Sequence, residues 1–134
     1  MAWKNWRGNL LTNLVNQAAI NGVKKTGELI LFEAKKEVPL DERTLSDSGI
    51  VIMAAGNIPA CVVSFGGGEG TGFPIIPYAI RWHEQNANFQ HGRKRFYLRD
   101  PFNRLAEKTL KRFLKEEMRI FTSWLLIILL IGWN

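Results

Sequence analysis

The residues best suited to chemistry lie between positions 77 and 101, which hold both histidines of the chain, three consecutive cations and several aromatic side chains. His83 and Glu84 match the first half of the HExxH motif, in which two histidines on one helix face bind zinc and the glutamate acts as a base. The second histidine would be needed at position 87, where the chain has Ala87, and His91 lies four residues further on. Two histidines without a pair of cysteines predict no metal site.

Two other arrangements, one for catalysis and one for nucleotide binding, lack the neighbouring residues that their motifs require. Ser46 or Ser48 could be combined with His83 and Asp47, but nothing around either serine resembles a nucleophile elbow. The glycine-rich run at 66–72 lacks the Gly-Lys-Ser/Thr ending of a P-loop and leads into a proline-containing segment instead of a helix. We therefore expect no catalysis, no cofactor and no nucleotide site, and we interpret the glycine-rich run as a hairpin tip or an assembly arm.

The cations Arg93, Lys94 and Arg95 are flanked by Phe89, His91, Phe96 and Tyr97. Positive charge beside stacking surfaces is typical of proteins that hold single-stranded nucleic acid. Arginine and aromatic residues are also enriched in protein interfaces, where charge pairs set the register. The composition of this cluster is compatible with both uses.

The overall composition is that of one folded, basic domain. Of 134 residues, 46% are hydrophobic and 22% charged, which is enough apolar material to bury a core. The net charge of +6 favours an acidic partner, although a solvated basic surface would have the same composition. Cys61 is the single cysteine, so no intrachain disulfide forms, and its apolar neighbours predict a buried, inert thiol in a reducing compartment.

Two long helices should frame the chain. Apolar residues recur at helical spacing over residues 6–36, with a bend or break expected near Gly22 or Gly27 and an end at Val38-Pro39. A second amphipathic helix should begin at Asp100-Pro101, where a capping side chain precedes a proline suited to the first turn. Lysines and arginines occupy much of its polar face.

Between the helices, short runs rich in Val, Ile and Phe predict a small antiparallel sheet. Residues 49–55 and 60–65, separated by a Gly- and Pro-containing turn, predict a hairpin. The alternation of Tyr78, Ile80 and Trp82 with polar neighbours predicts a third strand over 77–84, and residues 96–98 a possible fourth. The fold class expected is therefore α+β: a long N-terminal helix, a sheet of three or four strands and a C-terminal helix packed on the sheet.

The C-terminal stretch forms an apolar extension, 120–134, of a single domain, 1–119. Residues 120–133 carry no charge, but they are fewer than the roughly 20 apolar residues that a spanning helix needs. Burial of Trp124, Trp133 and their neighbours against another subunit is favoured over insertion into a membrane surface.

An ordered set of motifs resembles the small minor capsid, or head-tail connector, proteins of tailed bacteriophages. The set consists of Pro77-Tyr78-Ala79, His83-Glu84, Phe89, His91-Gly92, Arg93-Lys94, Tyr97-Leu98 and Pro101, preceded by Val38-Pro39-Leu40-Asp41, Thr44-Leu45 and Ser48-Gly49. The resemblance covers residues 38–105. Glu42-Arg43 stand where that family usually has a glycine, and the apolar end is not typical of it.

This resemblance implies a structural virion protein of the neck, a connector, tail-completion or tail-terminator component made in the host cytoplasm and acting without catalysis. It implies a homo-oligomeric ring, a hexamer or dodecamer, between portal-side and tail-side virion proteins, with non-specific DNA contact in the lumen and no membrane. The glycine-rich arm would order against an adjacent ring. The side chains expected at subunit or ring interfaces are Glu69, Tyr78, Arg81, His83, Glu84, Phe89, His91, Arg93, Lys94, Arg95, Tyr97, Trp124 and Trp133.

Overall fold

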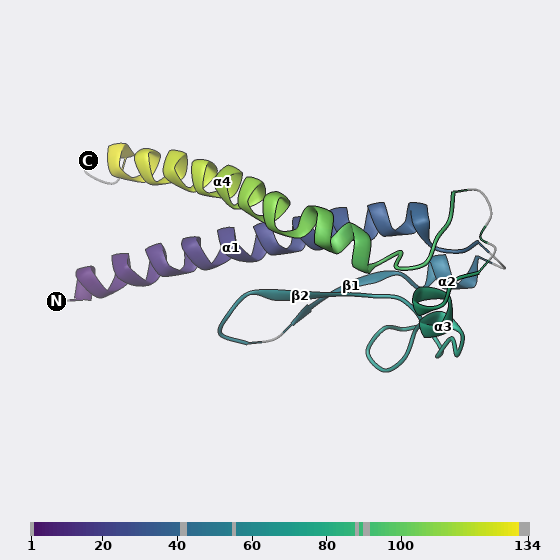
Figure 1. Ribbon diagram of the computed structural model, residues 1–134. Coiled ribbons are helices and arrows are strands. Elements are labelled where there is room, and N and C mark those ends of the chain that lie inside the picture. The colour runs from purple at the N-terminus through teal and green to yellow at the C-terminus, as the bar shows by residue number, and fades with distance from the viewer. Residues whose placement is uncertain (1, 41–42, 55, 88, 90–91, 132–134) are drawn as a thin grey trace.

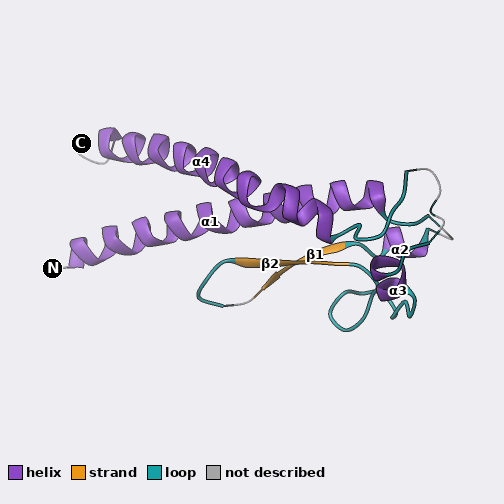
Figure 2. Cartoon of the chain, viewed as in Figure 1, coloured by secondary structure: helices purple, strands orange, loops and turns teal. Residues whose placement is uncertain are grey.

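The computed structural model describes residues 2–40, 43–54, 56–87, 89 and 92–131. Two long helices, α1 (Ala2–Glu37) and α4 (Arg99–Ile131), run antiparallel to each other, and the hairpin β1 (Ile50–Ala54) and β2 (Ala60–Ser64) lies along α1 (Figure 1). Two short helices, α2 (Thr44–Asp47) and α3 (Ala79–Glu84), lie at the end of the molecule away from the termini (Figure 2). The α+β class, the long N-terminal helix and the C-terminal helix are confirmed, but α4 packs on α1 and not on the sheet as expected.

Helix α1 runs unbroken through Gly22 and Gly27, so the break expected near them is absent. The reason is close packing. A Cβ at Gly22 would lie 2.7 Å from Leu114 Cδ2 of α4, and one at Gly27 would lie 2.7 Å from Cys61 Sγ of β2. The glycines let α4 and the sheet approach the helix axis, and this packing offsets their propensity cost of up to about 1 kcal/mol each. The helix ends at Glu37, as the Val38-Pro39 step predicts.

The predicted hairpin is confirmed. β1 and β2 pair antiparallel in a register that sets Ile50 opposite Ser64 and Ile52 opposite Val62. At the base of the hairpin, Ser48 Oγ donates to the Leu45 carbonyl at 2.6 Å and accepts the Gly66 N–H at 2.9 Å. Ser48 is 1% exposed, so the serine weighed as a nucleophile is a buried tie between α2 and the end of β2.

The expected third strand is wrong: residues 79–84 form helix α3. The chain leaves β2 through Gly66, whose φ of 100° turns it away from the sheet, and the Ile76 N–H donates to the Gly66 carbonyl at 2.7 Å. Segment 77–84 therefore has no strand to pair with. Helical spacing instead places Ala79, which is buried, on the same face as Trp82 and His83, while Ile80 is 78% exposed.

The possible fourth strand at 96–98 is also wrong. Phe96 has φ of 55°, which no strand residue adopts, and Tyr97 and Leu98 form the turn into α4. The Asp100 N–H already donates to the Phe96 carbonyl at 2.9 Å. Helix α4 consequently begins at Arg99, one residue before the predicted start, and Asp100 lies inside its first turn.

A compact apolar cluster joins the two short helices to the end of α1. It consists of Val38, Leu45, Ile76, Ala79 and Tyr97, with Phe65, Tyr78, Trp82 and Leu98 packed against it. This cluster holds α3 and the turn before α4 in place, so it positions the side chains between 77 and 101.

The far ends of α1 and α4 diverge toward the two termini (Figure 1). A gap of about 110 Å3 opens between them, lined among others by Leu14, Glu117, Phe121 and Trp124. Residues 120–131 form the last part of α4, where it diverges from α1. None of the described helices combines the length and the apolar character needed to cross a membrane.

Candidate functional site

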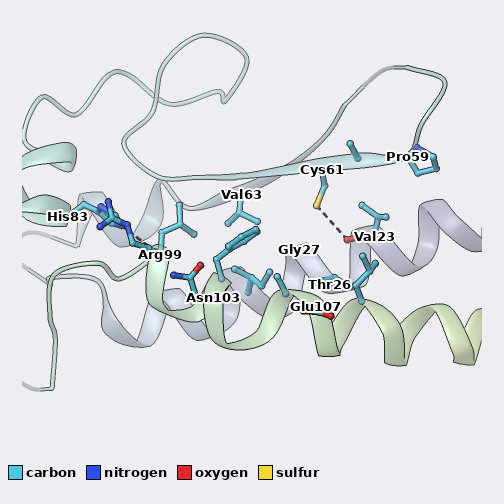
Figure 3. Close-up of a pocket in the computed structure, with 16 residues that line it drawn as sticks. Val23, Thr26, Gly27, Pro59, Cys61, Val63, His83, Arg99, Asn103 and Glu107 are labelled. Atoms are coloured by element: carbon cyan, nitrogen blue, oxygen red, sulfur yellow. Dashed lines mark hydrogen bonds between the residues drawn. The ribbon is translucent and has the colours of Figure 1, made fainter.

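An open groove of about 920 Å3 lies between α1, β2 and α4, with His83 of α3 at one end and Pro59 at the other (Figure 3). Its walls are mainly apolar and include Val23, Val63 and Phe102. The polar side chains along its rim come from separate elements: Thr26 from α1, Cys61 from β2, and Arg99, Asn103 and Glu107 from α4.

Two polar groups in this groove are hydrogen-bonded within the fold. Thr26 Oγ1 donates to the Gly22 carbonyl at 2.8 Å, and Cys61 Sγ lies 3.5 Å from the Val23 carbonyl, the contact dashed in Figure 3. Burial raises the pKa of the Cys61 thiol, so the weakly nucleophilic protonated form prevails near neutral pH. No base within the described lining contacts the sulfur. The groove therefore presents a mainly apolar surface with few polar groups.

His83 lies at the centre of a network that joins α3 to α4. Its Nδ1 is 2.8 Å from Glu84 Oε1, and its Nε2 accepts the Arg99 backbone N–H at 3.3 Å. These partners assign the ring proton to Nδ1, which donates to the carboxylate. Arg99 Nη2 donates to both Glu84 oxygens, at 2.9 and 3.1 Å. The histidine has no free nitrogen for catalysis or for a metal.

Ionic and aromatic contacts complete the network around His83. The hydrogen bond from His83, together with the Arg99 charge, holds the pKa of Glu84 below its ordinary range, so Glu84 is an anion. The His83 ring meets Tyr97 edge-on at 4.9 Å and Phe96 at 5.7 Å. Tyr97 is 2% exposed and donates its hydroxyl to the Ala79 carbonyl, and burial raises its pKa to about 12.

The basic cluster at 93–95 contacts its own chain. Arg93 Nη1 donates to the Lys35 carbonyl at 2.6 Å, where the C-terminal end of α1 leaves carbonyls without helical partners. Lys94 Nζ lies 3.6 Å from Glu37 Oε2 and 3.3 Å from Asp100 Oδ2. The Arg95 guanidinium lies 4.7 Å from the centre of the Phe96 ring. Arg93 and Lys94 thus cap α1 and fasten it to α4, which leaves less of their charge for an external anion.

Four other expected interface residues lie around α3 and the glycine-rich loop. Tyr78 and Phe89 are half-buried, and the Phe89 ring meets Trp82 edge-on at 6.0 Å. Arg81 is exposed on α3, within 6.0 Å of the Trp82 ring. Glu69 is exposed in the loop that the Gly68–Phe73 bridge closes. These side chains surround α3 but do not converge on a common point.

At the opposite end of the molecule, Trp124 is 57% exposed on α4. It is remote in sequence from the residues around α3, and the structure places it with the diverging helix ends. His91 and Trp133, also expected at interfaces, lie outside the described residues.

Sequence reasoning missed a polar link between α1 and α4. Glu117 is 7% exposed, and its Oε1 accepts Lys25 Nζ at 2.6 Å while its Oε2 accepts Asn21 Nδ2 at 3.3 Å. These donors lower the pKa of Glu117 below its ordinary value, and the hydrogen bond raises that of Lys25. The signal was present in the helical pattern, because Glu117 follows Thr109, Leu110, Phe113 and Leu114 on the inner face of α4.

Among the described residues, no three His, Cys, Asp or Glu side chains gather where they could hold a metal ion. The chain matches no protein-family model, no curated protein and no solved structure. Inference about function therefore depends on the geometry and on the motif resemblance alone.

Proposed function

We propose that this chain is a structural subunit of a tailed-phage neck, a head-tail connector or minor capsid protein that assembles into a ring between the portal and the tail. The observation that carries the proposal is the apolar surface at the diverging helix ends. It comprises Leu11 and Val15 of α1 and Met118, Ile120, Trp124, Leu126, Ile127, Leu129, Leu130 and Ile131 of α4, each between 40 and 75% exposed. We call this set the apolar fork.

The size of the apolar fork supports association. Ten large side chains that are about half exposed present on the order of 800 Å2 of apolar surface, which equals one partner's share of a standard protein interface. The largest apolar patch of an ordinary monomer is roughly 300–600 Å2. Exposed residues also point in every direction around the end of α4, and a helix that is apolar all round is usually buried. Further copies of the same chain are the proposed cover, because homo-oligomers are built from repeated contacts of this kind.

The network around His83 supports the same function from the other end of the molecule. Its residues carry the motifs shared with the neck proteins, and they hold α3 against the start of α4 as one rigid unit. A ring subunit needs rigid surfaces for its neighbours. The exposed side chains around this unit, among them Arg81 and Glu69, are the proposed contacts to portal-side or tail-side virion proteins.

Assembly would also complete the sheet. The hairpin has only two described strands, so each strand keeps one free edge. We propose that a strand from a neighbouring copy pairs with such an edge to give the three or four strands expected for this fold. The glycine-rich loop at 66–72, in which Gly66, Gly67, Gly68, Gly70 and Gly72 all have positive φ, is the proposed arm toward an adjacent ring.

The test is the oligomeric state of the purified full chain by native mass spectrometry and sedimentation velocity. The wild type should form closed oligomers, hexamers or dodecamers. The triple variant Leu126→Asn, Leu130→Asn, Ile131→Asn should be monomeric, with the same helix content by circular dichroism. The matched control, Ile58→Asn, Ile75→Asn, Ile80→Asn, replaces three side chains exposed by 75–80% outside the apolar fork and should still assemble.

A wild type that stays monomeric at high concentration contradicts the proposal. A monomer that floats with lipid vesicles and loses this property in the Leu126, Leu130, Ile131 variant would assign the apolar fork to a membrane surface instead. Equal assembly of both triple variants would place the subunit contact elsewhere on the molecule.

A further inference from the structure

The outer face of α4 carries a continuous line of cations. At 3.6 residues per turn, its members fall within roughly 100° of arc and extend for about 22 Å along the helix. All are exposed, and they are Arg104, Lys108, Lys111, Arg112, Lys115 and Arg119. We call this set the basic stripe.

The fold keeps this face of α4 turned toward solvent. Thr109 and Glu117, on the opposite side of the helix, are 3% and 7% exposed, and Glu117 bonds to Lys25 of α1. Leu110 lines the groove beneath α4. The inner side of α4 therefore faces α1 and the groove, which leaves the basic stripe free for a partner.

Much of the charge in the basic stripe is not neutralised by the protein. Lys111 pairs with Glu107 at 2.9 Å, and Arg104 reaches Glu37 at 3.6 Å. The structure records no ion pair for Lys108, Lys115 or Arg119 among the residues it describes. Charges on the C-terminal half of α1 alternate in sign, with Lys24 and Lys25 followed by Glu28 and Glu33. Between residues 104 and 119 of α4, the six cations of the basic stripe are accompanied by only two exposed acidic side chains, Glu107 and Glu116.

We propose that the basic stripe binds the phosphate backbone of duplex DNA without regard to sequence. Duplex DNA presents about one negative charge per 1.7 Å of its axis, so a 22 Å row of cations meets several phosphates at once. Lysine and arginine on one helix face, without aromatic or amide groups among them, suit phosphates rather than base edges. The assignment moves nucleic-acid binding away from Arg93 and Lys94, which the fold uses to cap α1.

Two other acidic partners fit less well. A helix that lies on an anionic membrane buries the apolar face next to its cations, but that face of α4 packs on α1, with Leu114 against Gly22. The centres of protein interfaces are depleted in charged residues, lysine above all, and the basic stripe has no apolar centre. Phosphates along a duplex match both its length and its single sign.

This inference is independent of the neck proposal. A monomeric chain would bind DNA through α4 as well, while a ring that ignores DNA would leave the neck proposal intact. If both proposals are correct, the outer face of α4 is turned toward the lumen through which DNA passes.

The experiment measures binding of the full chain to a labelled random-sequence duplex by fluorescence anisotropy between 50 and 200 mM salt. Each phosphate contact contributes about −0.9 to the slope of log K against log salt. The variant Lys108→Gln, Lys115→Gln, Arg119→Gln should therefore lose about 2.7 from the magnitude of the slope and weaken binding at least tenfold at the low-salt end.

The matched control is Lys24→Gln, Arg43→Gln, Arg81→Gln, three exposed cations outside the basic stripe. It removes the same formal charge, three units from +6, and should keep the wild-type slope. Sedimentation of the same samples ensures that oligomeric state is equal in the comparison.

Three results would overturn the assignment: equal losses in both triple variants, an unchanged slope in the stripe variant, or no binding of the wild type at 50 mM salt. Retention of anionic vesicles or polyglutamate by the basic stripe, with no binding to the duplex, would also overturn it.

Discussion

His83 has both of its ring nitrogens hydrogen-bonded to groups of its own chain. Nδ1 donates to Glu84, and Nε2 accepts from the backbone of Arg99. The neighbouring cations Arg93 and Lys94 are used in the same way, as caps and ties. The histidine and the cations between residues 77 and 101 thus fasten one element to another.

The Lys25–Glu117 pair gives a prediction about pH. The pKa of Glu117 is lowered from its ordinary value of 4.5, so its contribution to stability is complete above pH 4.5 and is lost as pH falls through the lowered pKa. The pKa of Lys25 is raised from 10.5, so its contribution is complete below pH 10.5 and is lost as pH rises through the raised value. Glu117→Gln should cost about 1 kcal/mol of unfolding free energy in the plateau between these limits.

Urea denaturation of the wild type and Glu117→Gln from pH 3 to pH 11 measures this difference. It should be constant across the plateau and shrink toward both extremes. Glu107→Gln is the control, since its exposed pair with Lys111 should contribute only a few tenths of a kcal/mol. A difference that does not vary with pH would contradict the role given to the pair.

At the scale of elements, the turn before α2 contains a residue in a strained backbone conformation. Arg43 precedes Thr44 with φ of 60° and ψ of −12°, in the left-handed region. Glycine adopts that conformation without a Cβ penalty, whereas arginine does not. The chain keeps the turn and carries a strained arginine in it.

Arg43→Gly should therefore raise the unfolding free energy by about 0.5–1 kcal/mol, because relief of the left-handed penalty exceeds the entropy cost of glycine. Thermal unfolding measures the change. Arg43→Ala removes the same side chain but keeps the Cβ, so it should give no such gain. A stabilisation that is equal in both variants would show that the arginine side chain, not the backbone, is the source.

Part of the fold follows from local patterns and part does not. The sequence predicts the hairpin and the end of α1 because both depend on neighbouring residues: the β-branched runs, the Gly-Asn-Ile-Pro turn and the Val38-Pro39 step. The sequence does not predict helix α3, because a six-residue segment fits both strand and helical spacing, and the turn at Gly66 decides between them. The links from Arg93 to Lys35 and from Lys25 to Glu117 join positions 58 and 92 residues apart, which no local pattern reveals.

At the scale of the whole molecule, one end is closed and the other is open. The apolar cluster and the His83 network tie α1, α2, α3 and the start of α4 together, while the apolar fork at the other end has no described cover. The expected ring contacts therefore lie at two separated places, around α3 and around Trp124. A subunit with two such contact regions can meet more than one neighbour.

Hydrogen exchange should detect this difference between the two ends of the molecule. In the monomeric Leu126, Leu130, Ile131 variant, amides of 120–131 should exchange rapidly, since helix ends with few packed neighbours open at low free energy cost. Amides of 104–114 should stay protected, because that part of α4 packs on α1. In assembled wild type, 120–131 should become protected by at least tenfold. Equal protection of 120–131 in both states would remove the apolar fork from the assembly contact.

The antiparallel pairing of the first and last helices also governs the order in which the chain can fold. During synthesis α1 is made before α4, and Lys25 and Glu117 are separated by 92 positions. Contacts that distant slow folding, because the intervening loop must close before they form. The part of α1 that packs on α4 consequently stays uncovered until α4 has been made, and that interval is when a nascent chain is most exposed to wrong association and to chaperones.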